Sequence, residues 1–287
     1  MSVKNIFTNS IKPALYLVPT PIGNIKDISS RAIEVLTEAD IIASEDTRVT
    51  SDLLNKLGIK NKTLISCYSQ NEKEKGKAII EKIQKENLIL AYCSDAGSPG
   101  ISDPGGILCS LALEKDIAVI ALPGPTAFVP ALTVSGFDTS KFTFIGFLPI
   151  KDSAKEKMLK EYSSKDELLI VYEAPHRIKK TLETLKKVFG GERKIAISRE
   201  ISKRYENHIY GTLNEICAME DFVEQGEFVI IIDKCQEKTL LDDEEILRLV
   251  KEKLEFGESL SQACRDIANE YDLPRNYVYK LCIKSKL

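Results

Sequence analysis

The stretch that decides the fold, residues 88–127, reads LILAYCSDAGSPGISDPGGILCSLALEKDIAVIALPGPTA. Two short apolar runs in it, residues 88–92 and 117–122, are typical of buried strands. Each run ends abruptly in a loop of glycine, proline and small polar residues. In open α/β sheets, ligands bind beyond the carboxyl ends of the strands. We therefore expect a crevice at this edge of a sheet, and a cofactor bound in it.

Apolar strand-like runs alternate with amphipathic segments on both sides of this stretch, which indicates an α/β fold with a parallel sheet. The pattern restarts at Lys141, so we place a domain boundary near residues 135–141 and expect α/β domains over residues 1–136 and 137–238. The predicted strands are residues 14–18, 40–43, 64–67, 88–92, 117–122, 142–147, 168–172, 194–198 and 228–232. The predicted helices include one capped by Ser29 or Ser30 and those over residues 49–57, 72–86, 154–162 and 178–189.

The last part of the chain, residues 239–287, has a different character and predicts a small helical domain. Residues 242–256 form one amphipathic pattern, and Ser259 is placed to cap a second helix. The break at residues 271–274 separates this second helix from a third. Two short helices joined by such a turn resemble a helix-turn-helix, which contacts nucleic acid. A plain helical cap fits the same pattern, so both interpretations stay open.

Composition narrows the class of protein. With 287 residues, 43% hydrophobic and 29% charged, the chain is typical of a globular protein with an ordinary core, without a membrane span. The first residues lack the apolar segment of a signal peptide, so we expect a cytoplasmic protein. Seven cysteines without a CxxC pair favour reduced thiols, and two histidines make a metal site unexpected. A net charge of −3 leaves nucleic-acid binding undecided.

The loops after the predicted strands suggest the class of ligand. Neither the GxGxxG nor the GxxxxGK[ST] pattern occurs in the chain, which disfavours dinucleotides and nucleoside triphosphates. Small residues, backbone groups and few charges suit a flat nucleoside with a short polar tail, such as S-adenosylmethionine. Its sulfonium favours carbonyl oxygens and a nearby carboxylate, and its ribose hydroxyls could pair with Asp95.

Five sequence blocks carry a resemblance to a known family. In order they are VPTPIGN (18–24), ASEDTR (43–48), SDAGSPGISDPG (94–105), LPGPTA (122–127) and YEAPHR (172–177). They resemble the signature blocks of the ribosomal RNA small subunit methyltransferase I family, within the tetrapyrrole methylase superfamily. The GSP at 97–99 stands where tetrapyrrole methylases carry GDP, a departure typical of the RNA-modifying branch.

The resemblance implies a fold, an activity and a set of binding residues. It implies a bilobal tetrapyrrole-methylase-like fold with a cleft between two α/β lobes, assembled as a homodimer. The activity is S-adenosylmethionine-dependent 2′-O-methylation of a cytidine ribose in the decoding region of 16S rRNA, free or within the small ribosomal subunit. The implied cofactor-binding residues are Pro19, Thr20, Pro21, Gly23, Asp95, Ala96, Gly97, Ser98, Ile101, Ser102, Pro123, Gly124, Thr126, Ala127, Tyr172, Glu173 and Ala174.

Methyl transfer to an alcohol is slow unless a base removes the hydroxyl proton. The first candidates for this chemistry are Glu45, Asp46 and Arg48, followed by Glu173 and by the pair Arg199 and Glu200. Asp46 with Arg48 could equally be a structural ion pair, and His176 could merely cap a helix. The sequence does not name the base. Arginine groups can hold phosphates, and the candidates for RNA contact are Arg48, His176, Arg177, Arg275 and Lys280.

Two other functions remain open. One is C-methylation of a tetrapyrrole such as a precorrin or uroporphyrinogen, although a basic, aromatic pocket for its carboxylates is not evident in the loops. The other is an RNA-binding or ribosome-assembly factor that keeps an inactive cofactor fold. Binding of S-adenosylmethionine distinguishes this last possibility from both enzymes.

Overall fold

The computed structural model describes residues 13–235, 242–271 and 273–285. The chain divides into two compact units, Met1–Lys234 and Cys235–Leu287. The expected boundary between residues 238 and 239 lies outside the described residues, and the boundary at 136 stays a prediction. Within the described ranges, no helix combines the length and apolar character needed to cross a bilayer.

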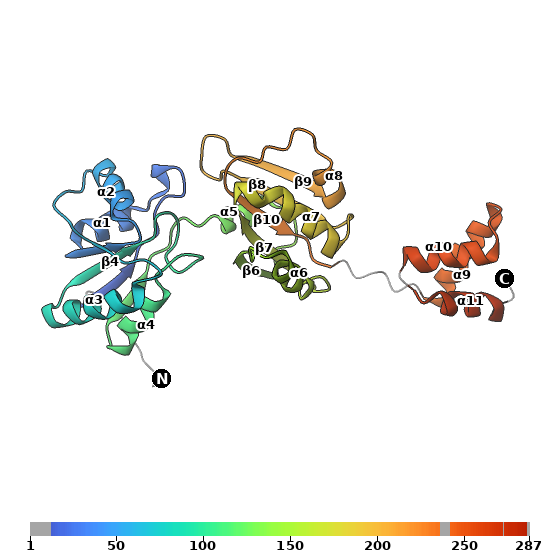
Figure 1. The fold of residues 1–287 in the computed structure, drawn as a ribbon, viewed down its shortest axis with the longest axis horizontal. Helices are drawn as coiled ribbons and strands as arrows, with labels where there is room; N and C mark the ends of the chain where they lie inside the picture. Colours follow the sequence, from blue (N-terminus) through green and yellow to red (C-terminus); the bar gives the residue numbers. More distant parts are fainter. Residues whose placement is uncertain (1–12, 236–241, 272, 286–287) are drawn as a thin grey trace. The chain divides into compact units, whose positions relative to one another are not determined.

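The first sheet of the larger unit is parallel throughout, as predicted (Figure 1). Its five strands lie in the order β3 (Thr63–Ser66), β2 (Ile41–Ser44), β4 (Ile89–Cys93), β1 (Ala14–Leu17) and β5 (Ala118–Ala121). Side chains of α1 (Ser30–Glu38) and α2 (Thr47–Lys56) pack into the core on one face. Those of α3 (Glu72–Glu86) and α4 (Gly106–Glu114) cover the other face.

Side-chain caps explain where these helices begin. The Ser29 hydroxyl accepts the Ala32 N–H and caps α1 as predicted, and the Asp46 carboxylate caps α2 by accepting the Arg48 N–H. This cap starts α2 two residues before the predicted position. Glu72, buried at the start of α3, accepts the N–H groups of Gly105 and Leu108, each at 2.9 Å. The Glu72 carboxylate therefore anchors the end of the 94–105 loop.

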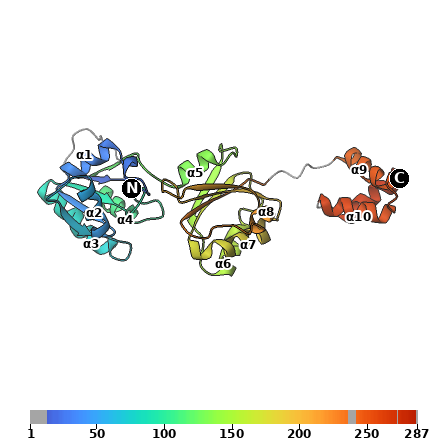
Figure 2. The ribbon, with the colours of Figure 1, turned by 90° about the horizontal axis from the view of Figure 1, so that it is seen from above.

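The second sheet is mixed rather than parallel. Its five strands lie in the order β6 (Phe142–Phe147), β7 (Leu168–Glu173), β10 (Phe228–Ile232), β8 (Lys194–Arg199) and β9 (Asn207–Thr212), and only β6 and β7 pair in parallel. Figure 2 shows α5 (Phe128–Val134) on one side of this sheet. On the other side lie α6 (Asp152–Lys160), α7 (Ile178–Phe189) and α8 (Leu213–Cys217).

Three elements of this half were not predicted. Strand β9 lies at the sheet edge with polar, partly exposed residues, so its sequence lacks a buried apolar run. Helix α8 is only five residues long and depends on a capping box between Thr212 and Glu215. Helix α5 is short and carries Pro130 in its first turn, a position that proline tolerates. Short or edge elements leave weak periodic signals.

The second sheet approaches the 94–105 loop at one glycine. The pairing of β6 with β7 shifts register between Phe144 and Gly146, and Gly146 has a φ of +68°. A Cβ atom added at Gly146 would lie 2.7 Å from the Ser102 hydroxyl oxygen. Glycine is needed here both for the left-handed backbone and for this close contact.

The smaller unit contains α9 (Asp243–Glu255), α10 (Leu260–Glu270) and α11 (Arg275–Lys284) around its own apolar core. The Ser259 hydroxyl accepts the Gln262 N–H and caps α10 as predicted. Tyr279, Lys280 and Ile283 are exposed on α11. The helix-turn-helix interpretation of this unit stays a prediction.

Candidate functional site

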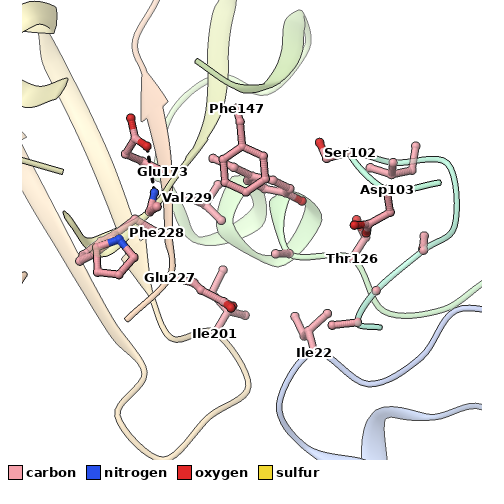
Figure 3. Close-up of a pocket in the computed structure, with 18 residues that line it drawn as sticks. Ile22, Ser102, Asp103, Thr126, Phe147, Glu173, Ile201, Glu227, Phe228 and Val229 are labelled. Atoms are coloured by element: carbon pink, nitrogen blue, oxygen red, sulfur yellow. Dashed lines mark hydrogen bonds between the residues drawn. The ribbon is translucent and has the colours of Figure 1, made fainter. Parts of the chain in front are cut away.

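A pocket of about 350 Å³ lies between loops of the first sheet and strand ends of the second (Figure 3). Figure 3 shows Ser102, Asp103 and Thr126 facing Phe147 and Val229 across it. Its volume falls within the range of small-molecule sites. The lining residues are Ile22, Ala96, Gly97, Ser98, Ile101, Ser102, Asp103, Thr126, Ala127, Phe147, Tyr172, Glu173, Ala174, Pro175, Ile201, Glu227, Phe228 and Val229.

Hydrogen bonds hold the loops after β1, β4 and β5 together. The backbones of Thr20 and Gly97 exchange two hydrogen bonds, of 2.9 and 3.0 Å. The Thr20 hydroxyl also donates to the Ser94 carbonyl, and the Ser98 hydroxyl donates to the Pro125 carbonyl at 2.9 Å. The pocket is thus bordered by the loops that follow β4 and β5, where the sequence predicted a crevice.

Aromatic side chains form part of the opposite side. Phe147 and Tyr172 meet edge to face with ring centroids 5.6 Å apart. The Tyr172 hydroxyl accepts the Phe128 N–H at 3.1 Å, which ties this ring to the start of α5. These rings offer an apolar surface to a flat ligand.

The charged groups in the lining are acidic. Asp103 and Glu227 line the pocket, and lysine and arginine do not occur among its lining residues. Partial burial, followed by the nearby carboxylates of Glu45 and Asp95, raises the pKa of Asp103 to about 6. Burial and the carboxylates of Asp95 and Asp46 also raise the pKa of Glu45. An electronegative pocket of this kind favours a cationic ligand over a phosphate.

The structure divides the predicted cofactor-binding residues into two groups. Lining the pocket are Ala96, Gly97, Ser98, Ile101, Ser102, Thr126, Ala127, Tyr172, Glu173 and Ala174. Outside the lining are Pro19, Thr20, Pro21, Gly23, Asp95, Pro123 and Gly124. Thr20 belongs to the hydrogen-bonded support of the loops, and Gly124 packs against Pro19, where an added Cβ would come within 2.6 Å of the Pro19 Cβ. Gly124 also borders a second recess with Ile22 and Thr126.

The first catalytic candidates, Glu45, Asp46 and Arg48, lie at the start of α2 and outside the pocket lining. The Asp46 carboxylate binds the Arg48 guanidinium at 2.6 Å and the Arg48 N–H at 2.8 Å. These hydrogen bonds from Arg48 lower the pKa of Asp46 to about 2. The Asp46 carboxylate therefore caps α2 and is already bound to Arg48. The Arg48 side chain is 89% exposed and stays available to a partner.

Glu173 belongs to a buried polar network below the pocket. Its side chain is 0% exposed and accepts hydrogen bonds from the Ala174 N–H and the Thr181 hydroxyl, with the Arg177 Nε 3.1 Å away. The buried Lys155 ammonium donates to the Thr181 hydroxyl at 2.9 Å, and burial lowers its pKa. In Figure 3 the Glu173 carboxylate points away from the space between Phe147 and Asp103. This geometry favours a positioning role over acid–base chemistry.

Arg177, predicted to touch RNA, is mostly buried in the same network. Its guanidinium donates to the carbonyls of Leu148 and Pro149, which follow strand β6. It therefore links the loop after β6 to the loop after β7. His176, in the 3₁₀ turn Pro175–Arg177, is exposed.

The remaining candidates lie elsewhere. The Arg199 guanidinium donates to the Gln225 carbonyl at 3.0 Å. The Glu200 carboxylate binds the Lys203 ammonium and the Glu227 N–H, so both residues support the segment before β10 and stay outside the pocket lining. Arg275 and Lys280 are exposed on α11 of the smaller unit.

Sequence reasoning missed the lining residues Ile22, Asp103, Phe147, Pro175, Ile201, Glu227, Phe228 and Val229. Ile22, Asp103 and Pro175 lie within three of the quoted blocks, where the sequence does not tell a lining side chain from a supporting one. The others belong to the second half, and their position depends on how the two sheets face each other.

Comparisons with known proteins agree with this architecture. Residues 14–217 match the family model of Tetrapyrrole (Corrin/Porphyrin) Methylases. Among solved structures, the methyltransferase CobJ superposes with a TM-score of 0.58 at 17% identity, over 77% of this chain and 94% of that one. Uroporphyrin-III-C-methyltransferase from Thermus thermophilus superposes with a TM-score of 0.52 at 18% identity, over 77% and 94%. At these identities the likeness concerns the fold alone.

Sequence relatives define the family more narrowly. Ribosomal RNA small subunit methyltransferase I from Halalkalibacterium halodurans is 39% identical over 279 residues, which cover 94% of each chain. The protein of the same name from Synechocystis sp. is 37% identical over 273 residues, which cover 94% of this chain and 97% of its own. The chain therefore belongs to the tetrapyrrole methylase family and, within it, to the ribosomal RNA small subunit methyltransferase I family of enzymes.

Proposed function

We propose that the chain uses S-adenosylmethionine to methylate the ribose 2′-hydroxyl of a cytidine in the decoding region of 16S rRNA. The observation that supports this cofactor is a pocket whose charged lining groups are carboxylates, without lysine or arginine among them. A sulfonium nucleoside is cationic and lacks phosphates, so it suits this lining. When bound, S-adenosylmethionine supplies a methyl group activated by the positive sulfur.

The lining residues differ in which part of a ligand their side chains can contact. The small residues Ala96, Gly97 and Ala127 leave room for a ligand against the backbone. Tyr172 and Phe147 provide apolar surface for a flat ring, and the Ser98 and Thr126 hydroxyls lie in hydrogen-bonding loops. This mixture of apolar surface and a few polar groups is typical of small-molecule sites.

Small ribosomal subunit RNA is the substrate that the relatives' names indicate. We propose that Arg48 and His176 contact its phosphates, because both are exposed near loops after the strands. Arg275 and Lys280 are the corresponding candidates in the smaller unit. Phosphate contacts supply most of the affinity of such proteins. We further propose a cytoplasmic homodimer acting on 16S rRNA, as the family resemblance implies.

The decisive experiment offers purified protein and labelled S-adenosylmethionine to small ribosomal subunits from a strain lacking the family's enzyme. We expect label at one cytidine ribose, located by its resistance to alkaline cleavage. Subunits from the parent strain, already methylated, serve as the control. Absence of label on the first subunits would contradict the proposal.

Two further measurements separate the alternative functions. Methylation of a precorrin or uroporphyrinogen by the same preparation would favour the tetrapyrrole enzyme, although an acidic lining opposes a polycarboxylate substrate. Calorimetry with S-adenosylmethionine tests the scaffold alternative. No binding heat in the presence of intact RNA binding would favour an assembly factor.

A further inference from the structure

Asp103 occupies a boundary between two hollows of the molecule. It lines the pocket described above, and it also borders an open recess with Ser69, Glu72 and Ile107. Figure 3 shows its side chain extending from the 94–105 loop toward the interior of the pocket. A group at this boundary can meet both a ligand in the pocket and a substrate that enters from the recess.

The loop holds Asp103 in a defined position. Ser102 before it has a φ of +64°, and the Gly100 N–H donates to the Pro104 carbonyl at 3.0 Å across it. The buried Glu72 carboxylate accepts the N–H of Gly105, two residues after Asp103. A side chain on such a constrained loop is preorganised, which is what acid–base chemistry requires.

Asp103 differs from neighbouring carboxylates in its partners. Asp46 binds Arg48, Asp95 accepts the Asp46 N–H, and Glu227 binds Lys203. Within residues 13–235, no lysine, arginine or histidine lies at ion-pair distance from Asp103. Its carboxylate is therefore free to accept a proton from a substrate.

The groups that face Asp103 are acidic or neutral. Glu45 follows β2, Asp95 follows β4, Tyr172 lies near the end of β7, and Glu227 precedes β10. Two of them, Glu45 and Asp95, add to partial burial in raising the pKa of Asp103 to about 6. A base is most effective when its pKa lies near the working pH.

We infer that Asp103 is the general base that removes the proton from the ribose 2′-hydroxyl, an inference that rests on the proposed function. The proton passes from the 2′-oxygen to a carboxylate oxygen of Asp103. The ribose 2′-oxygen bonds to the methyl carbon as the sulfur–methyl bond breaks, and the bonding pair stays on sulfur, which becomes a neutral thioether. Asp103 then releases the proton to solvent through the open recess.

The test compares wild type with Asp103→Asn, Asp103→Glu and a control, Glu114→Gln. Glu114 is an exposed carboxylate at the far end of α4, outside the pocket lining. We expect Asp103→Asn to lower kcat by about 10²- to 10⁴-fold, the usual contribution of a positioned base. Calorimetry should show that Asp103→Asn still binds S-adenosylmethionine, with an affinity lowered by a much smaller factor than kcat because Glu227 remains in the lining. Glu114→Gln should behave like wild type in both measurements.

Two readouts distinguish a base from a merely structural residue. The wild-type rate should rise with pH through about 6, and this limb should disappear in Asp103→Asn and return in Asp103→Glu. Carbon-13 NMR of the free protein should show an aspartate carboxyl that titrates near this pH and is absent from the Asp103→Asn spectrum.

Each contrary result has a distinct meaning. If wild type methylates subunits and Asp103→Asn does so at an equal rate, the base assignment is wrong and the proposed function stands. Loss of cofactor binding with unchanged kcat at saturation would also overturn the assignment. If wild type transfers no methyl group to the subunits, the proposed function fails and the role of Asp103 with it.

Discussion

Carboxylates on the two sides of the pocket differ in what surrounds them. Glu173, on the second sheet, is fully buried and engaged by Arg177, Thr181 and a backbone N–H. Asp103, on the first-sheet side, is exposed to the pocket and has other carboxylates as its nearest charges. Both lie in conspicuous sequence blocks. This difference shows that a carboxylate's ability to take part in a reaction depends on the groups that contact it, and the sequence blocks do not reveal those groups.

The largest effect on the free energy of unfolding should come from removing Glu173 from its buried polar network. Glu173→Ala leaves the Arg177 and Lys155 cations without their carboxylate, and removing one partner of a buried pair typically costs about 3–5 kcal/mol. We expect a loss of this size in the free energy of unfolding, measured by urea denaturation. Hydrogen exchange of β7 and α7 amides should locate the change. The control is Glu224→Ala, which removes an exposed partner of Lys179 and should change stability little. Equal losses in both variants would contradict the comparison.

A smaller effect on stability is expected when Lys155, at the other end of this network, is replaced. Lys155→Met keeps the volume and removes one of the two cations beside Glu173, so we expect a change below about 1.5 kcal/mol. Burial lowers the pKa of Lys155 in the folded protein below its ordinary value of 10.5. Between these two pKa values the unfolded chain holds a proton on Lys155 that the folded protein has lost. Wild-type stability should therefore rise as pH rises toward 10.5, and Lys155→Met should lack this rise. A loss as large as that of Glu173→Ala would refute this reading.

The pH dependence of stability due to Asp103 should have the opposite sign to that due to Lys155. Its pKa rises from 3.8 to about 6 on folding, so the folded state binds more protons between these values and stability falls as pH rises through them. Above pH 6, Asp103→Asn should be more stable than wild type, by under about 1 kcal/mol because the group is exposed to solvent. Below pH 3.8 the two should agree. Thermal unfolding followed by circular dichroism measures the difference, and a destabilised variant at pH 7 would count against it.

The smallest effect on stability is expected for the exposed pair of Asp46 and Arg48. Arg48→Ala should leave the melting temperature unchanged, since an exposed ion pair contributes little. It should weaken binding to small-subunit RNA and reduce the salt dependence by about one counterion. Lys56→Ala, at the other end of α2, is the matched control. Unchanged RNA affinity would show that this end of α2 does not contact the substrate.

The sequence predicted the first half of the molecule better than the second. Strands β2 and β4 of the parallel sheet are fully buried and largely apolar, and α3 has the predicted bounds because its periodic pattern is long. In the second half, α7 has the predicted bounds for the same reason. The mixed pairing of the second sheet was not foreseen, because β9 is a polar edge strand. Strand direction depends on connections that local periodicity does not encode.

The residues of the candidate site were likewise easier to predict in the first half than in the second. Residues of the 94–105 and 122–127 loops could be identified, because tight turns and small residues are visible in the sequence. Phe147, Ile201 and Phe228 could not, because their place in the lining depends on how the sheets face each other. Burial of Glu173 by Lys155 and Thr181 was equally hidden, since those partners lie on separate helices.

The contact at Gly146 has a consequence for how this pocket can diversify. Its left-handed backbone lies against the Ser102 hydroxyl, so a methyl group added at residue 146 would strain the backbone and require either the Ser102 side chain or the β6 strand to move. At this point the main chain of Gly146 faces the Ser102 side chain with no room for a further atom between them. New ligand preferences would have to arise by exchanging projecting side chains such as Ile22 or Phe147, while this junction is held constant.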